Sequence, residues 1–385
     1  MKMSMLRRYF RRTTGGVVTE LRLVTLRGDR GKLCAQTVAS VVFAVYLADI
    51  FNLKERWWVA LSAYALIRAS PTVVFRRCLE RLAGTVIGAS IGVLLATMAS
   101  RQSGLTVVAL SFVSGLGVYC MLGSPYSYSW VLGTVTAIMV LSDAVGVDSS
   151  PSLAVNRVLD VSVGVLATAT ISAASFSIER LLRRGPSSVN LSGPSERSSR
   201  DSFTPHVAEC SRSTRIWQAL QGAIAIALIG SVNHFHALPN FVQSMVSVIA
   251  VLLVSPLVLL NGHVEEAVHV RMFNRLLGCF CAVLFAAPLL PLIGDTPFLC
   301  LLVLGTGVWL AAHVQAGSGE VSYIGTQFGV GFIMIFVQDY AWSTDASAAL
   351  QRLWGILVAL LILTATMAAF SEVGRKFRLH GRGDV

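Results

Sequence analysis

Apolar runs long enough to cross a bilayer recur through most of this chain, and they constrain its fold more than any other feature. A transmembrane helix needs about 20 mostly apolar residues. The chain is 54% hydrophobic and 13% charged, whereas soluble chains are about 25% charged. The sequence therefore predicts an all-α, polytopic membrane protein. We expect about 12 transmembrane helices, over residues 33–51, 57–75, 82–100, 104–123, 128–147, 153–178, 216–236, 241–260, 272–293, 297–315, 321–339 and 348–370. Ten or eleven full spans stay open as alternatives, because an apolar run can be re-entrant.

Short motifs recur in the two halves of the chain and predict an internal repeat. They are Ser70-Pro71 with Ser255-Pro256, Arg81-Leu-Ala-Gly84 with Arg275-Leu-Leu-Gly278, Leu132-Gly-Thr134 with Ile324-Gly-Thr326, and Asn156-Arg157 with Gln351-Arg352. We predict a first six-helix repeat over 33–178 and a second over 216–370. Copies with an even number of spans run parallel, and substrate sites in such folds lie near the repeat interface.

The polar segments between and around these repeats are rich in basic residues. Residues 1–32 hold nine Lys or Arg against two acids, and the linker 179–215 holds seven Arg and nine Ser. A basic tail, 371–385, closes the chain. We expect the N-terminal segment to bind anionic lipid headgroups and the linker to bury no core.

The formal net charge of +11 does not favour nucleic-acid binding, because the basic residues flank apolar runs. With the N-terminus inside and twelve spans, the outer loops receive five of the 31 Lys and Arg. Basic residues concentrate in cytoplasmic loops of membrane proteins. We therefore predict that both termini are cytoplasmic, and residues 1–32 lack the pattern of a cleaved signal peptide.

The stretch from Arg68 to Gly88 combines charge with small residues. An arginine inside an apolar run is expensive in a bilayer, and Pro71 weakens the helix near Arg68. Arg81 and its basic neighbours are expected at the cytoplasmic edge. The structural motif after that edge consists of Arg81, Gly84, Thr85 and Gly88, with Arg275 and Gly278 as its second copy. Small residues at this spacing let another helix approach closely.

These residues resemble the fusaric acid resistance (FUSC) family of bacterial inner-membrane transporters. The resemblance is carried by Arg56-Trp57-Trp58-Val-Ala-Leu-Ser62, then Pro71-Thr72, then Arg81-Leu-Ala-Gly84-Thr85-Val-Ile-Gly88. More distantly, the chain resembles plant aluminium-activated malate transporters. It lacks the soluble cytoplasmic domain of larger members and so is similar to short, membrane-only ones. The resemblance implies a secondary transporter in the inner membrane that exports small aromatic carboxylic acids, driven by the proton gradient or membrane potential. The sequence leaves open whether a periplasmic adaptor protein carries the substrate onward.

Arg68 is the first candidate for binding such an organic anion. A guanidinium can hold a carboxylate in bidentate geometry. The alternative is that the long Arg68 side chain snorkels to the cytoplasmic face. Trp57, Trp58 and Pro71 complete the candidate substrate site, although paired tryptophans also mark an interfacial aromatic belt.

Four titratable residues are candidates for proton coupling, since intramembrane carboxylates and histidines carry protons in transporters. Asp143 and Asp339 end corresponding apolar runs, Asp160 follows Arg157 by one turn, and His313 lies near the end of a predicted span. Structural roles are the alternatives: polar residues at an outer interface for Asp143 and Asp339, an ion pair with Arg157 for Asp160, and a hydrogen-bonded histidine for His313.

Other chemistry is not indicated. The seven cysteines form no CxxC pair, and His263, Glu266 and His269 point to different sides of a helix at their spacing. No Walker motif is present, and no nucleophile–base set is recognisable, so we expect neither enzyme activity, metal nor cofactor. A channel-like anion pore and a non-transporting scaffold of an envelope complex are the alternative functions. The sequence does not specify an oligomeric state.

Overall fold

The computed structural model describes residues 3–23, 28–68, 70–99, 103–143, 150–182, 211–253, 264–293, 296–317, 319–338, 342 and 347–380. These residues are almost entirely helical, and their one β-type contact is an isolated bridge between Val337 and Trp342. The predicted all-α class is confirmed for this part of the chain. We call residues 28–182 the first half and residues 211–380 the second half.

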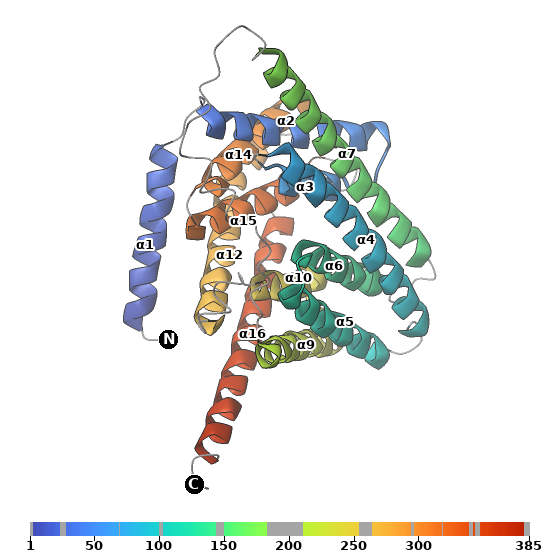
Figure 1. Cartoon of the computed structure of the whole chain (residues 1–385), viewed down its shortest axis with the longest axis vertical. Helices are drawn as coiled ribbons and strands as arrows, with labels where there is room; N and C mark the ends of the chain where they lie inside the picture. The colour runs from blue at the N-terminus through green and yellow to red at the C-terminus, as the bar shows by residue number, and fades with distance from the viewer. Residues whose placement is uncertain are drawn as a thin grey trace.

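The first half follows an N-terminal helix, α1, which stands at the edge of the molecule in Figure 1. The bounds up to the linker are α1 (Met3–Arg22), α2 (Gly28–Ile50), α3 (Arg56–Leu66), α4 (Pro71–Ala99), α5 (Ser103–Gly123), α6 (Ser127–Asp143) and α7 (Ser150–Leu182).

The second half ends in a long helix that projects toward the C-terminus in Figure 1. Its bounds are α9 (Arg212–Phe235), α10 (Phe241–Leu252), α12 (Val264–Ala286), α13 (Leu290–Ile293), α14 (Pro297–Gln315), α15 (Gly319–Phe336) and α16 (Ser347–His380).

Eight helices among the described residues are long and apolar enough to cross a membrane. They cover Gly28–Ile50, Pro71–Ala99, Gly104–Gly123, Pro151–Leu181, Arg212–Phe235, Val264–Ile293, Pro297–Gln315 and Ala349–Val373. Four other helices coincide with predicted spans but are shorter, among them α3 with 11 residues and α10 with 12. The chain is thus a multi-pass membrane protein, while twelve full spans are not confirmed.

A break in the backbone divides the single span that we predicted over 57–75. Helix α3 ends at Leu66, Ile67 is extended at φ −61° and ψ 131°, and α4 begins at Pro71. Proline disfavours helical φ and ψ angles at the residue before it, and proline itself is well suited to the first position of a helix. The basic segment around Arg76 therefore belongs to the first turns of α4 and is not a turn between two helices.

The core forms across both halves. Within the first half α4 packs on α6 and α7, and within the second half α12 packs on α15 and α16. Between the halves α5 packs on α9, α2 on α14, α6 on α10 and α3 on α15. Figure 1 shows α4 and α7 side by side, with α5 beside α9. Buried apolar residues of both halves, such as Val45 with Phe332, share one cluster.

Glycines allow the closest of these contacts. A Cβ atom added at Gly84 would meet the backbone of Ser129, and one at Gly88 would meet that of Gly133, both on α6. A Cβ added at Gly278 on α12 would lie 2.7 Å from the Ile324 carbonyl oxygen on α15. Small residues thus bring α4 against α6 and α12 against α15 at backbone distance.

Candidate functional site

Arg81 is buried between three helices of the first half, with only 4% of its surface exposed. Its Nη2 donates to Ser62 Oγ on α3 at 2.9 Å, and its Nη1 donates to Tyr128 OH on α6 at 3.0 Å. The position of Arg81 at the cytoplasmic edge of the membrane stays a prediction, and its side chain is covered there by α3 and α6.

Arg157 forms a second buried cationic centre, on α7. Its guanidinium pairs with Glu55, which precedes α3, and lies 3.4 Å from Asp143 at the end of α6. The Arg157 guanidinium carbon is also 5.4 Å from the centroid of the Trp58 ring. Contacts of this kind between a guanidinium and an aromatic face are attractive.

Trp58 lies close to both arginines, because the Arg81 guanidinium carbon is 5.9 Å from its ring centroid. We call Arg81, Trp58, Arg157, Glu55 and Asp143 the Trp58 cluster. Its two arginines and two carboxylates balance in formal charge. The formal charges of the cluster therefore sum to zero inside apolar helices, where an uncompensated charge is expensive, while Arg81 Nε and Trp58 Nε1 are buried without a hydrogen-bond partner.

The second half contains a corresponding pair of buried arginines, Arg275 on α12 and Arg352 on α16, which we call the Arg352 pair. Arg275 donates from Nε to Ser247 Oγ at 3.2 Å and from Nη1 to Gln327 Oε1 at 2.7 Å. Arg352 is 5% exposed, and its Nε and Nη1 have no hydrogen-bond partner. Cys279 and Arg275, both on α12, are close enough to act on Arg352 electrostatically, and Cys279 also forms a side-chain hydrogen bond with Arg352.

Arg68 belongs to neither set and lies in the break between α3 and α4. It is half-buried, and its Nη1 donates to the carbonyl oxygen of its neighbour Ile67. Burial lowers the pKa of the Arg68 guanidinium to about 10, and Arg77 acts in the same direction. The side chain therefore remains cationic at neutral pH.

The other residues of the predicted substrate site do not all lie together in the structure. Trp57 packs edge-on against Trp58, with ring centroids 5.1 Å apart, and its ring centroid lies 5.8 Å from the Arg157 guanidinium carbon. Pro71 is exposed at the start of α4, next to Arg68 in the loop but away from the Trp58 cluster.

The described candidates for proton coupling lie at different places in the structure. Asp143 belongs to the Trp58 cluster, whereas Asp160 is buried on α7 with 2% of its surface exposed. His313 is fully buried on α14, and its Nε2 lies 3.1 Å from the carbonyl oxygen of Glu20 on α1. Asp339 lies outside the described residues.

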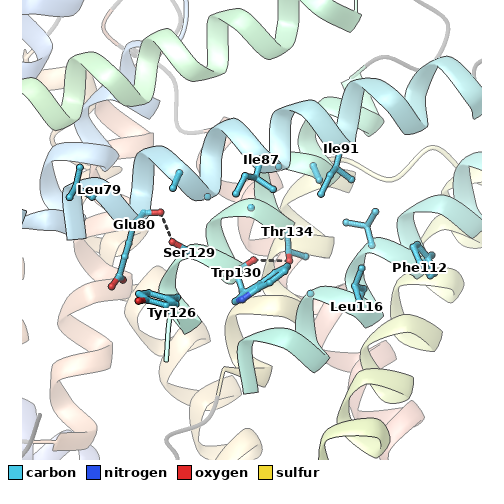
Figure 2. Close-up of a pocket in the computed structure, with 17 residues that line it drawn as sticks. Leu79, Glu80, Ile87, Ile91, Phe112, Leu116, Tyr126, Ser129, Trp130 and Thr134 are labelled. Carbon is cyan, nitrogen blue, oxygen red and sulfur yellow. Dashed lines mark hydrogen bonds between the residues drawn. The ribbon is translucent and has the colours of Figure 1, made fainter. Parts of the chain in front are cut away.

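A groove of about 430 Å³ opens over α4, α5 and α6 on the outer surface of the first half. Figure 2 shows its apolar lining, including Ile87, Phe112 and Trp130. At one end Ser129 Oγ donates to the Glu80 carbonyl oxygen at 2.7 Å. No arginine lines this groove, so it suits an apolar group and is separate from the Trp58 cluster.

Sequence reasoning missed most of the partners that organise the arginines. Glu55, Tyr128, Ser247 and Gln327 are separated from their arginines by 28 to 102 residues. One signal was available, namely that Arg157 and Arg352 recur at the same place in the repeat motifs. A charge repeated at one position inside an apolar helix marks a buried site.

Comparison with known proteins gives one family match. Residues 42–171 match the family model described as fusaric acid resistance protein-like. No match was found among curated proteins or among solved structures. The matched range contains α3, α4, α6 and the Trp58 cluster. The family match and the membrane-helical architecture suggest a membrane transporter. The match over residues 42–171 supports the assignment of this chain to the fusaric acid resistance (FUSC) family.

Proposed function

We propose that this protein is a secondary transporter of the inner membrane that exports small, aromatic organic acids. The observation that carries the proposal is the set of four arginines buried inside apolar helices. Arg81, Arg157, Arg275 and Arg352 are each at most 5% exposed. Intramembrane arginines are rare because their burial is expensive, and they mark pathways for charged substrates.

The proposed architecture is a pair of parallel six-helix repeats. The helix contacts support it, because most contacts in the first half have a counterpart in the second, for example α4 on α6 with α12 on α15, and α3 on α7 with α10 on α16. The contacts between halves are reciprocal as well, α5 on α9 with α14 on α2. Such reciprocity is expected of two copies related by a two-fold axis.

The buried tryptophan supports an aromatic substrate. Trp58 carries a guanidinium near its ring and belongs to the cluster that balances two arginines. An aromatic carboxylate offers a ring for stacking and a charge for an arginine, which matches this combination of groups. In this proposal Arg68, with Pro71 beside it, receives the anion from the cytoplasm before the anion reaches the buried arginines.

The proposed driving force is the membrane potential or the proton gradient. Moving one negative charge out of a cell that is negative inside releases roughly 2.3 kcal/mol per 100 mV. A monoanion therefore needs no coupled proton. Asp143 is the best-placed coupling candidate among the described residues, because it shares Arg157 with Glu55.

Reconstituted vesicles test the proposal. Vesicles that contain the purified protein and are loaded with benzoate should release it faster than protein-free vesicles, whereas uncharged benzamide should leave both at the same rate. Failure of the protein to accelerate release of any aromatic acid tested would contradict the proposed function.

Arg68→Gln tests the proposed entry residue, and Arg76→Gln is its matched control, because Arg76 is an exposed arginine near the start of α4. Loss of a charge-assisted hydrogen bond of about 1.5–3 kcal/mol predicts a fall in flux of roughly tenfold or more for Arg68→Gln. Equal flux in the two variants, at equal protein content, would contradict the proposed entry role of Arg68. It would leave the rest of the proposed function unaffected.

A further inference from the structure

The two buried arginine sets are built on corresponding helices, but their charges are compensated differently. In the first half Glu55, which directly precedes α3, and Asp143 both pair with Arg157. In the second half Asn240 directly precedes α10. An amide there cannot neutralise a guanidinium, so the carboxylate that the first half places before α3 has no counterpart before α10.

The described neighbours of the Arg352 pair are neutral. Arg275 donates to Ser247 and Gln327, a hydroxyl and an amide. No carboxylate in the described part of the chain forms an ion pair with Arg275 or Arg352. Within the described part of the chain, Arg275 and Arg352 are thus two buried like charges without a carboxylate partner.

Unused hydrogen-bond donors accompany this excess charge. Nε and Nη1 of Arg352 are buried without a partner. Gln243 is the third residue of α10, as Trp58 is the third residue of α3, and its Nε2 is likewise buried without a partner. Buried donors are nearly always satisfied in folded proteins, and an uncompensated buried charge costs several kcal/mol.

A bound anion would resolve both problems, because a carboxylate brings a negative charge and two acceptor oxygens. We propose that the Arg352 pair is the anion-binding site of this protein, and that it takes a monovalent aromatic carboxylate. The Arg157 side of the Trp58 cluster is then a structural counterpart, closed by its own Glu55 and Asp143. This inference rests on the proposed function for the identity of the anion, but the site itself can be tested without transport.

Thermal unfolding of the purified protein in detergent, with benzoate as the probe, tests the site. A ligand that binds only the folded state raises its stability in a saturable way. Benzoate should therefore raise the melting temperature, compared with gluconate at equal ionic strength. Absence of any benzoate-specific shift in the unmodified protein would overturn the proposal.

Arg352→Met is the decisive variant. Replacing a buried, uncompensated charge by an apolar side chain of similar size is often neutral or stabilising. We expect Arg352→Met to melt at or above the unmodified protein in gluconate and to lose the benzoate shift. Retention of the shift in Arg352→Met would overturn the site, and so would a fall in its melting temperature in gluconate.

Variants of the first half are the matched controls. Arg157→Met removes the cation that pairs with Glu55 and Asp143, so it should lower the melting temperature in every buffer. The combined variant Arg157→Met, Glu55→Gln and Asp143→Asn removes all three charges and should keep the benzoate shift. Loss of the benzoate shift in this combined variant, with the fold retained, would show that the anion binds in the first half. That result would overturn the proposal.

Asp339 needs its own variant, because it corresponds in sequence to Asp143 and lies outside the described residues. Asp339→Asn should retain the benzoate shift. If Asp339→Asn instead lowers the melting temperature and Arg352→Met restores it, Asp339 is the counter-ion of Arg352 and the proposal fails.

The outcomes also separate this site from the proposed function. A benzoate shift that depends on Arg352 without any benzoate flux would refute the transporter and retain the site. Flux that Arg352→Met leaves unchanged would retain the transporter and refute the site.

Discussion

At the scale of single residues, burial and partners decide what each arginine does. Arg81 and Arg68 lie 13 positions apart, yet one donates to Ser62 and Tyr128 inside the bundle and the other donates to its neighbouring carbonyl group. A guanidinium with fixed neutral acceptors is held in one orientation. Arg81 is therefore the more rigidly placed of the two.

Ser62→Ala tests how much the fold depends on this placement. The change leaves Arg81 Nη2 without its acceptor on α3, and an unsatisfied buried donor costs about 1–3 kcal/mol. We expect a lower melting temperature than in the unmodified protein. Ser90→Ala is the control, since Ser90 on α4 is exposed and bonds only to the Val86 carbonyl group of its own helix. Equal melting temperatures of the two variants would show that Ser62 does not position Arg81.

At the scale of helices, close approach depends on glycine. Gly88 on α4 meets Gly133 on α6 so closely that a Cβ atom would overlap the Gly133 carbonyl oxygen. Neither backbone can move without disturbing the rest of the α4 contact with α6. Overpacking of such a contact costs about 1–3 kcal/mol.

Gly88→Ala should therefore lower the melting temperature and reduce the yield of folded protein. Gly104→Ala is the matched control, because a Cβ atom there meets nothing within 4 Å. Near the start of α5, alanine should be neutral or slightly stabilising, since it favours the helix over glycine. A Gly88→Ala variant as stable as Gly104→Ala would mean that α4 and α6 do not pack at this distance.

The N-terminal helix α1 is attached to the bundle through His313. The imidazole Nε2 of His313 contacts the Glu20 carbonyl oxygen near the end of α1, and the Glu20 carboxylate pairs with Arg30 at 2.7 Å. His313→Leu removes the first of these contacts. We expect trypsin to cleave the chain at Arg22 faster in this variant than in the unmodified protein. N-terminal sequencing of the product identifies the cleavage site. Equal cleavage rates would show that α1 docks without His313.

At the scale of the whole molecule, the distribution of charge predicts one orientation in the membrane. The linker and both terminal segments carry most of the basic residues, and such segments remain cytoplasmic. The reciprocal contacts of the two halves are compatible with this arrangement, since parallel halves place both termini on one side.

Protease protection tests this orientation. Trypsin added to inside-out vesicles should cleave within 183–210 and remove a C-terminal tag, whereas right-side-out vesicles should protect both. A periplasmic marker protein and a cytoplasmic marker protein establish the orientation of the vesicles. Cleavage of the linker from the outside would contradict the predicted topology.

Much of the architecture follows from the sequence because hydropathy is a local property. Runs of apolar residues predicted a multi-pass helical protein, and the repeated Arg-x-x-Gly motif singled out Gly84 and Gly278, which lie at helix contacts in both halves. The same reasoning predicted a helix weakened by Pro71 near Arg68, but not that the helix ends at Leu66, because the apolar run continues through Ile67. It also did not predict the burial of Arg81, because burial depends on neighbouring helices and not on distance from the end of an apolar run.

The sequence by itself determined that this chain is a bundle of membrane helices, because bilayer length and hydropathy act on each segment alone. Only the tertiary structure decided which partner each arginine meets. Glu55 reaches Arg157 across 102 residues, while Arg352 keeps two donors without a partner. Such pairings depend on how helices far apart in the chain pack, and no local pattern encodes that packing.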